Sequence, residues 1–408
     1  MRCRVFVSLR WGLLFVFTAC LQAAEPDVQL ALAPISVRAA TLRVGPGQQF
    51  VRPSQAIAAA KDGDVIEIDA KGDYRGDHAK ITKNKLTLRG VGQGRAKLPC
   101  KGNDIGDKGI WNITGSDAVV ENIEFSGARV RDRNGAGIRP EGQNLTVRNC
   151  RFYDCENGIL TGRGELLVEY CEFEHCGPVG QPATHSLYIA ESCTKLTFQY
   201  NYSTDVIQGH LLKSRAKENY ILYNRLTDGA VGGSAVMDFP NGGYVVVVGN
   251  SLQKSRNAQN DRVIAWGMEN VTHSRNALYV VNNTMVYEHR HTNNVWFVRA
   301  DHTPADFTAV IRNNLCIGAI PLTNVANAEK SGNLLLNSVA DAGLVEAAQF
   351  DYRIKTGSPA IGKGIPPGMA GTFDLTPKFE YVHPCSMKKR PNSGTLDAGA
   401  FQHGAANR

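Results

Sequence analysis

Residues 196–201 read LTFQYN, residues 245–250 read VVVVGN and residues 278–283 read LYVVNN. In each stretch a short apolar run leads to one position, here termed the anchor, which is asparagine. Related segments recur about ten times between residues 84 and 335, with anchors at Gly90, Ile123, Cys150, Cys171, Asn201, Asn224, Asn250, Asn283, Asn314 and Asn333. A unit that returns every 19 to 33 residues is typical of a solenoid. The two-residue periodicity inside the unit indicates a strand.

The anchors from Asn201 to Asn333 are all asparagine, and the two anchors at Cys150 and Cys171 are cysteine. If equivalent residues of successive coils stack, neighbouring anchors lie about 4.8 Å apart. The side-chain amide of one asparagine can then donate to the next one and also bind its own turn. Asparagine is common in turns for local reasons alone, but this does not explain why the apolar residues keep one register around it. The repeat therefore predicts a buried asparagine ladder.

Length and composition agree with a single elongated domain. The chain has 408 residues and 41 glycines, and helical periodicity is almost absent. Repeats at this spacing stack into one body and do not form separate globular domains. We expect an all-β fold of about ten coils with parallel strands, occupying residues 43–402.

Both ends of this domain are predicted to cover exposed edge strands, which a solenoid requires. Residues 43–70 read as strand, turn, helix and strand, and residues 53–61 (PSQAIAAAK) begin with Pro53 and Ser54, which favour a helix start. Residues 343–402 are rich in glycine and proline. We interpret them as an irregular covering segment.

The N-terminus has the pattern of an export signal. Arg2, Arg4 and Arg10 precede an apolar run that is too short to span a membrane. Residues 1–24 are predicted to be a signal peptide, which places the mature chain in the periplasm or outside the cell. A lipid anchor at Cys20 is an alternative. Cleavage would lower the formal net charge from +7 to +4. A mildly basic chain suits an acidic polymer as partner. The export signal and the lack of basic tracts argue against nucleic acid as a partner.

Four cysteines fall at equal spacing in two successive coils. Cys150 and Cys155 lie in NCRFYDC, and Cys171 and Cys176 lie in YCEFEHC. Stacked coils bring Cys150 to Cys171 and Cys155 to Cys176 within disulfide distance. For Cys150 and Cys171 we favour small buried hydrophobic residues, and a bridge between Cys155 and Cys176 stays open as an alternative. No metal site is predicted from these residues.

A family resemblance accompanies these features. The start RVGPGQQFVRPSQAIAAAKDGDVIEI (43–68), the coil repeats and the endings GSPAIGKG (357–364) and LDAGAF (396–401) resemble right-handed parallel β-helix proteins of the pectate-lyase-like superfamily. The resemblance implies this fold over about residues 43–402. It says less about activity, because the superfamily contains lyases, hydrolases, epimerases and proteins without catalysis. We expect a monomer.

Polymer-binding β-helices use one exposed strand face as a groove. Here the strand that precedes each anchor strand is the candidate, and it includes GAGIRPEG, ENGILTGRG, HSLYIAES, SAVMDFPNGG, RVIAWG and NVWFVR. The predicted substrate-binding residues on this face are Arg139, Glu141, Arg163, Asp238, Arg262 and Arg299, and the groove is predicted to have a positive potential. Surface strands often carry charges without a function. The alternative reading is therefore an ordinary solvated face.

Residues 209–219 (GHLLKSRAKEN) resemble the lysine-serine stretch of the chondroitinase B and alginate lyase group of β-helix lyases. In that group a lysine removes the proton α to a uronate carboxylate, an arginine of the following coil assists, and calcium neutralises the carboxylate. Lys213 matches the lysine, and we predict it to be the base, with its pKa lowered by the potentially cationic neighbours His210 and Arg215. His210, Arg215, His185 and Tyr188 are the predicted helpers.

The match is incomplete. The following coil reads AVMD at 235–238, so the assisting arginine is absent, and HLL at 210–212 lacks the acidic calcium ligands. Calcium is therefore only an option, and no cofactor is predicted with certainty. A structural ion pair between Lys213 and Asp238 would explain both residues without catalysis.

The sequence thus favours an exported lyase that cleaves an acidic, uronate-containing polysaccharide by β-elimination. A lyase that uses Tyr188 or His185 as its base is one alternative. The others are a glycoside hydrolase or epimerase on the same fold and a non-catalytic glycan-binding scaffold.

Overall fold

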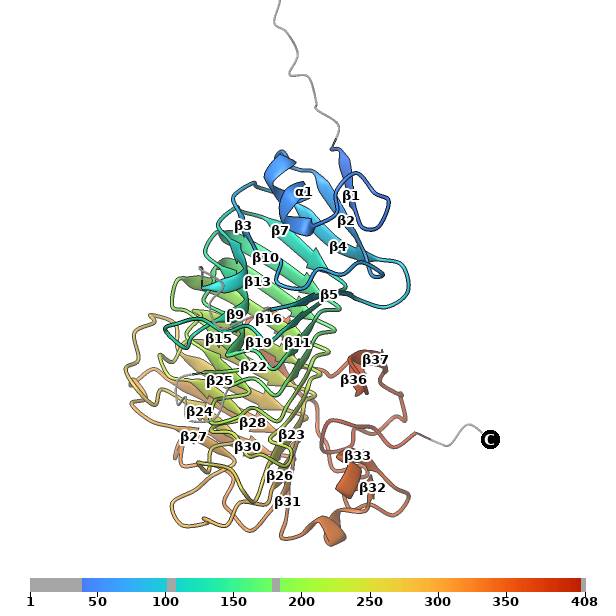
Figure 1. The fold of residues 1–408 in the computed structure, drawn as a ribbon. Helices are drawn as coiled ribbons and strands as arrows, with labels where there is room; N and C mark the ends of the chain where they lie inside the picture. The colour runs from blue at the N-terminus through green and yellow to red at the C-terminus, as the bar shows by residue number, and fades with distance from the viewer. Residues whose placement is uncertain (1–38, 101–107, 178–183, 405–408) are drawn as a thin grey trace, which may run out of the picture. The chain divides into compact units, whose positions relative to one another are not determined.

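The computed structural model describes residues 39–100, 108–177 and 184–404. The predicted signal peptide and Cys20 lie outside these residues. Nearly all strands of this body belong to three long parallel sheets, and the chain visits them in the repeating order A, C, B (Figure 1). Successive circuits stack into a parallel β-helix, as the repeat predicted.

Sheet A has twelve strands: β1 (Thr41–Val44), β2 (Val65–Asp69), β4 (Thr87–Val91), β7 (Ala118–Glu121), β10 (Gln143–Arg148), β13 (Arg163–Glu169), β16 (Cys193–Gln199), β19 (Glu218–Leu222), β22 (Tyr244–Val248), β25 (Ala277–Val281), β28 (Thr308–Arg312) and β30 (Glu329–Ser331). Sheet C has ten strands: β5 (Ala96–Pro99), β8 (Ile123–Ser126), β11 (Arg151–Tyr153), β14 (Glu172–Glu174), β17 (Tyr202–Thr204), β20 (Arg225–Thr227), β23 (Ser251–Lys254), β26 (Thr284–Tyr287), β29 (Leu315–Ile317) and β31 (Leu334–Leu336). Sheet B has nine strands: β3 (Ala79–Ile81), β6 (Gly109–Ile113), β9 (Ala136–Pro140), β12 (Asn157–Leu160), β15 (Leu187–Ile189), β18 (Leu212–Ser214), β21 (Met237–Phe239), β24 (Ile264–Trp266) and β27 (Val298–Ala300). The ten strands of sheet C agree with the expected ten coils.

Side chains of one strand face fill the interior, and equivalent residues stack from coil to coil. Phe125, Phe152 and Phe173 are fully buried, with ring centroids 5.4 and 4.8 Å apart and nearly parallel planes. Phe198 extends the stack at 5.9 Å. Because parallel strands hold identical register, each apolar residue covers its neighbour and leaves no edge inside the solenoid.

The asparagine ladder is confirmed at the turn between sheets A and C. Asn224 donates from its backbone and side-chain nitrogens to Oδ1 of Asn250 at 2.8 and 2.9 Å. Asn250 repeats the pattern toward Asn283 at 2.9 and 2.9 Å, and Asn283 toward Asn314 at 2.9 and 3.0 Å. Asn314 ends the ladder on Asn333. All but Asn333 are fully buried, so each amide satisfies polar groups that water cannot reach.

Cysteine continues the ladder where asparagine stops. The backbone nitrogen of Cys171 donates to Oδ1 of Asn201 at 2.9 Å, and the backbone nitrogen of Cys150 donates to Sγ of Cys171 at 3.4 Å. The anchor assigned at Gly90 was wrong: Gly90 lies inside β4, paired with Ile68. Glycine resembled an anchor because the residue before each anchor adopts a left-handed turn conformation, for which glycine is also suited.

The N-terminal cap forms as expected. Helix α1 (Pro53–Ala59) follows β1, and its Ala56 and Ile57 are buried against the first coils. It is the only α-helix among the described residues. A proline in the first turn and alternate small apolar residues explain its position.

The C-terminal residues 339–404 contain three two-stranded antiparallel sheets: β32 (Leu344–Glu346) with β33 (Asp351–Ile354), β34 (Met369–Ala370) with β35 (Phe373–Asp374), and β36 (Phe379–Val382) with β37 (Ser386–Lys389). Two short 3₁₀ helices, η1 (Val339–Ala342) and η2 (Ala347–Gln349), lie in the same segment. We expected this segment to cover the open end of the solenoid.

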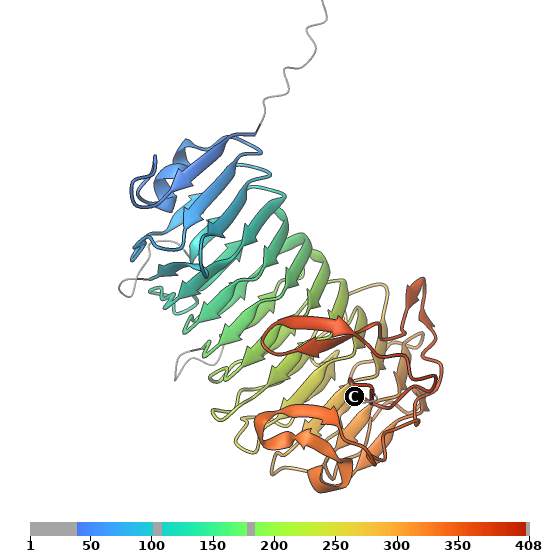
Figure 2. The same cartoon turned by 90° about the vertical axis from the view of Figure 1, so that its right-hand side faces the viewer.

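Instead it packs along the side of the coils (Figure 2). Lys378 donates from its backbone to the Tyr223 hydroxyl at 3.0 Å, and the Cys385 thiol bonds to the Cys171 carbonyl at 3.0 Å. The tyrosine side chains explain the position, since Tyr170, Tyr200 and Tyr223 stack on the outside of the A–C turns and need an apolar cover.

The cysteines of the described residues are free thiols. Cys155 and Cys176 are fully buried, and their sulfurs face backbone carbonyls. Burial raises the pKa of the Cys155 thiol to about 12. The disulfide considered between Cys155 and Cys176 is therefore not formed, and these residues act as small core side chains.

Candidate functional site

The outer face of sheet B carries several of the predicted site residues in one column. In the strand register Tyr188 of β15 lies beside Lys213 of β18, and Lys213 lies beside Asp238 of β21. The same register continues through Ala265 to Arg299 of β27. Adjacent strands are about 4.8 Å apart, so Tyr188, Lys213 and Asp238 lie side by side on one surface.

Lys213 lies between two carboxylates. Its Nζ is 3.0 Å from Oε1 of Glu269 and 3.5 Å from Oδ2 of Asp238. Its side chain is 13% exposed, that of Asp238 only 3% and that of Glu269 47%. The ion pair between Lys213 and Asp238 that the sequence allowed is thus present, together with a second, more exposed partner.

Arg215 binds the same exposed carboxylate. Its Nη2 is 2.7 Å from Oε2 of Glu269, and its Nε donates to the Tyr188 hydroxyl at 3.0 Å. The side-chain oxygen of Asn241 accepts a further bond from this guanidinium. Burial alone would lower the pKa of Arg215, but the bonds to Glu269 and Tyr188 outweigh it and raise the pKa. Arg215 is therefore a fixed positive charge.

Two histidines lie at the edge of this cluster. The ring of His185 stacks on Tyr188 with centroids 5.5 Å apart, and His185 Nδ1 accepts from the backbone nitrogen of His210 at 3.1 Å. Nδ1 of His210 is also 3.1 Å from Nδ1 of His185. Because His185 Nδ1 accepts a hydrogen bond from a backbone N–H, it carries no proton, so His210 Nδ1–H is the donor in this second contact. A neutral His210 then turns the lone pair of Nε2 toward Asp238, 3.5 Å away.

Both histidines are uncharged near neutral pH. Burial, with the charges of Lys213 and Arg215, lowers the pKa of His185 to about 3. Burial is also the main cause that lowers the pKa of His210 well below its usual value. The expectation that His210 would be a cationic neighbour of Lys213 was therefore wrong, because a histidine this deeply buried loses its proton.

Asp238 is the most strongly buried acid of the cluster. Burial raises its pKa, while the positive charges of Lys213 and Arg262 oppose that shift. Its Oδ1 is buried without a hydrogen-bond partner. Glu269 behaves oppositely: burial alone would raise its pKa, but hydrogen bonds from Lys213 and Arg215 outweigh this and lower it.

The remaining predicted substrate residues are more scattered. Arg139 lies on sheet B beside Asn112 and pairs with Glu141 at 2.7 Å, and Arg299 pairs with Asp301 at 2.9 Å. Because both arginines are paired with acids, the positive groove expected here is partly neutralised.

Two further predicted substrate-binding residues lie outside the strands of sheet B. The placement of Arg163 on this face was wrong, since it begins β13 in sheet A. Arg262 precedes β24 and acts on His210 and Asp238 through its charge.

Comparisons with known proteins support the fold. The family described as "Right handed beta helix region" matches residues 98–285. The crystal structure of the pectate lyase Pel9A aligns over 91% of this chain and 98% of its own, with 14% identity and a TM-score of 0.60. The chain has the fold of a right-handed parallel β-helix protein. The handedness expected from the family resemblance is thereby confirmed.

Other similarities to this β-helix protein are weaker. The alginate lyase from Paenibacillus sp. str. FPU-7 has 13% identity and a TM-score of 0.42 over 73% of this chain and 99% of its own. The PL6 family alginate lyase AlyGC has 15% identity and a TM-score of 0.35 over 84% of this chain and 59% of its own. Scores below 0.5 do not establish a shared fold. No curated protein matches this chain significantly. No helix in the described part of the chain is long and apolar enough to cross a membrane.

Calcium does not fit the site of this β-helix protein. Within residues 39–100, 108–177 and 184–404, no group of three or more His, Cys, Asp or Glu side chains is arranged to hold a metal ion. The two carboxylates of the cluster, those of Asp238 and Glu269, each have an oxygen within 3.5 Å of Nζ of Lys213. Hard cations need several free oxygens, but Oδ2 of Asp238 and both oxygens of Glu269 already face Lys213 or Arg215, which leaves only the buried Oδ1 of Asp238 without a partner.

Sequence reasoning missed Glu269 and Asn241. Glu269 follows β24 by three residues, in RVIAWGMEN, and reaches back to Lys213 and Arg215 across 54 or more residues of sequence. The only available signal was an acid directly after a groove strand. Asn241 likewise follows β21 in MDFPN. Loops of variable length hide such contacts, since spacing in the sequence does not fix where a loop side chain points.

Proposed function

We propose that this protein is a polysaccharide lyase that cleaves a uronate-containing polymer by β-elimination on the outer face of sheet B. The observation that carries the proposal is the convergence of Lys213 and Arg215 on one half-exposed carboxylate, that of Glu269, beside the Tyr188 hydroxyl. The predicted export of the chain would place it with such polymers.

Glu269 occupies the position that a substrate carboxylate would take. It is the most exposed member of the cluster, so it can swing away at little cost, whereas Lys213 is also held by the buried Asp238 and Arg215 by the buried Asn241. A uronate carboxylate bound to Arg215 loses much of its negative charge. The neighbouring C–H proton then becomes easier to remove, because the carbanion formed beside it is stabilised.

Lys213 serves as the base in this proposal. It must first lose its proton, and Asp238 is placed to accept it at 3.5 Å, since burial already favours the protonated form of this acid. The lone pair of His210 Nε2 lies 3.5 Å beyond and can share that proton. Neutral Lys213 then takes the proton from C5 of the uronate as the bond from C4 to the glycosidic oxygen breaks and a C4=C5 double bond forms.

Tyr188 supplies the proton that the leaving oxygen needs. Its oxygen accepts a bond from Arg215 Nε, so its own O–H remains free to donate. Tyr188 and Lys213 project from neighbouring strands of one face. They would therefore act on the same side of the sugar. This favours uronates whose C5–H and C4–O bonds lie on the same side, as in mannuronate and glucuronate, over galacturonate.

The test is product formation on a panel of polymers. Polymannuronate, glucuronan, polyguluronate and polygalacturonate are each incubated with the protein, and the ultraviolet absorbance of the unsaturated product is followed. We expect a signal on the first two polymers. New reducing ends without absorbance would identify a hydrolase, and no product on any polymer would leave a glycan-binding scaffold.

A glycoside hydrolase is the second candidate, because the pKa of Asp238 is raised and that of Glu269 is lowered. Two carboxyl groups with opposite shifts can serve as acid and base. The burial of Asp238, whose side chain is 3% exposed, counts against this role. A glycosidic oxygen would have to enter beneath Lys213 to reach it.

A further inference from the structure

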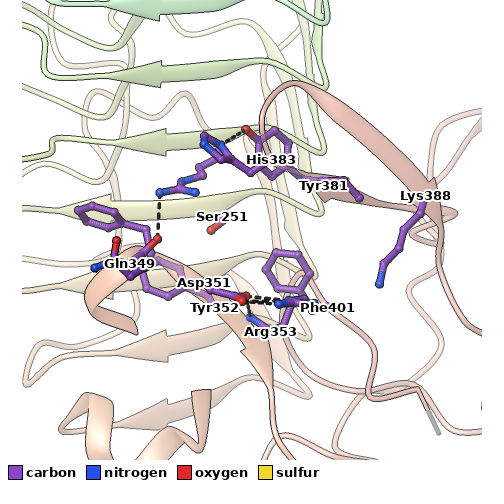
Figure 3. A pocket seen from close by; sticks show the side chains of 12 residues that line it. Ser251, Gln349, Asp351, Tyr352, Arg353, Tyr381, His383, Lys388 and Phe401 are labelled. Carbon is purple, nitrogen blue, oxygen red and sulfur yellow. Dashed lines mark hydrogen bonds and ion pairs between the residues drawn. The ribbon is translucent and has the colours of Figure 1, made fainter. Parts of the chain in front are cut away.

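A cavity lies on a different side of the solenoid from the sheet B cluster, between the outer face of sheet C and the C-terminal segment. Its volume is about 420 Å³, within the range of small-ligand sites. Ser251 lies on the sheet wall, Asp351 and Arg353 come from β33, and Tyr381 and His383 come from the β36–β37 hairpin (Figure 3). Nothing in the proposed reaction uses this cavity.

The cavity contains a buried arginine without an acidic partner. Arg225 is 8% exposed, and within the described part of the chain no carboxylate forms an ion pair with it. Its guanidinium lies 5.2 Å from the ring centre of Tyr202 and 5.3 Å from that of Phe350. One nitrogen, Nη2, donates to the carbonyl of Gln349 at 3.2 Å, but Nε is buried with no partner. A desolvated cation in this state favours an anion beside it.

The other charges around the cavity leave it positive. Arg353 is held by Asp351, with Nε to Oδ1 at 2.8 Å. Lys388 is 3.1 Å from Glu380, but its side chain is half exposed and can turn. Although burial raises the pKa of Asp351, hydrogen bonds from Arg353 and the charge of Arg225 lower it, so this acid stays ionised and engaged.

The remaining lining is aromatic. Phe350, Tyr352, Tyr381 and Phe401 face the space, and Tyr381 is also hydrogen-bonded to His383 at 3.1 Å. Flat aromatic faces pack against the C–H faces of sugar rings, and a guanidinium binds a carboxylate through parallel N–H bonds. We propose that this cavity is a second, non-catalytic binding site for the carboxylate of an acidic sugar unit, with Arg225 as its principal anchor.

Such a site would hold a remote part of the polymer while another part lies on sheet B. The two binding events then reinforce each other through effective concentration and not through a new contact in the catalytic cluster. The choice of a uronate as ligand rests on the proposed function. The test therefore measures binding at the cavity separately from turnover.

The probe is a β-1,4-linked mannuronate trisaccharide, and its neutral counterpart is β-1,4-mannotriose. His383 lines the cavity, so its ring signals are followed by NMR during the titration. Every protein sample carries Lys213→Met, so that no probe is cleaved. We expect saturable shifts with the trisaccharide and none with mannotriose. Arg225→Gln should weaken the trisaccharide affinity read from His383 about ten- to a hundred-fold.

Arg151→Gln is the matched control. Arg151 also lies on sheet C with its guanidinium 4.8 Å from an aromatic ring, that of Tyr153, but it is paired with Glu124 and Glu174. This substitution should leave the His383 titration unchanged. If Arg225→Gln does not fold, the half-exposed Lys388→Gln should weaken binding about two- to five-fold.

Unmoved His383 signals, equal binding of mannotriose, or full affinity in both cavity variants would overturn the proposal. A protein that binds at His383 but cleaves no polymer would refute the lyase and leave this site standing.

Discussion

Replacing Lys213 with methionine tests both roles of this residue at once. The change keeps most of the side-chain volume but removes the amine, so Asp238 keeps His210, at 3.5 Å, and the charge of Arg262. Breaking a fully buried pair costs about 3–5 kcal/mol. Because Lys213 is 13% exposed and its Nζ is 3.5 Å from Asp238, we expect the free energy of unfolding to fall by about 2–4 kcal/mol near neutral pH.

The loss should depend on pH with a definite sign. Burial raises the folded pKa of Asp238 above its unfolded value of about 3.8, and removing the amine raises it further. A group with a raised folded pKa contributes stability below its unfolded pKa and loses it as pH rises through the folded pKa. The difference in free energy of unfolding between Lys213→Met and the parent protein should therefore be small near pH 4 and largest at pH 8.

The double variant Lys213→Met/Asp238→Asn separates structure from chemistry. Urea unfolding should show that much of the lost stability returns, because no buried carboxylate is left unpaired. Turnover of the preferred uronate polymer should remain lower by about 10²–10⁴-fold, the usual contribution of a general base. If turnover recovers together with stability, Lys213 is not the base. If the single variant is as stable as the parent at pH 8, the ion pair contributes nothing and the structural part of the reasoning is refuted.

Three further predictions follow. Asn250→Ala should cost about 2–4 kcal/mol in urea unfolding, since the neighbouring ladder groups lose their partner, whereas the exposed Asn144→Ala should cost less than about 1 kcal/mol; equal losses would contradict a buried ladder. Glu269→Gln should lower KM for the uronate polymer about two- to ten-fold with little change in kcat, because a carboxylate that competes for Arg215 is removed; a raised KM would mean that Glu269 assists binding. Lys254→Met breaks a fully buried pair with Asp228 at 2.9 Å and should cost about 3–5 kcal/mol without changing kcat of the folded fraction; a selective loss of kcat would place Lys254 in the reaction.

The repeat was readable because its cause is local. Each coil must turn tightly after a sheet A strand, and a buried turn needs a side chain that satisfies its backbone groups, so asparagine recurs at one register. Cys150 and Cys171 were placed correctly in this column. The sulfur of Cys171 accepts from the backbone nitrogen of Cys150, as an asparagine oxygen would, and the backbone nitrogen of Cys171 donates to Oδ1 of Asn201. The error at Gly90 arose because the anchor and the preceding left-handed residue select overlapping residue types.

The site was only partly readable. Alternation along a strand put Tyr188, Lys213 and Asp238 on one face, and parallel register made them neighbours. The same reasoning misplaced Arg163, because a two-residue turn separates it from β12 and it begins β13 in sheet A. The charge state of His210 could not be inferred either. Burial keeps this histidine neutral, and the sequence of a single strand does not show how deeply a side chain is buried.

The sequence by itself determined the solenoid, its cap helix and the column of polar residues on one strand face, because periodicity of two and constant turn chemistry act within a single coil. Only the tertiary structure decided which loop atoms meet that column. Glu269 bridges Lys213 and Arg215, and the C-terminal segment lies on the side of the coils, where it encloses Arg225. Both contacts join residues more than 50 positions apart, and their energies depend on burial and distance, which exist only once the coils have stacked.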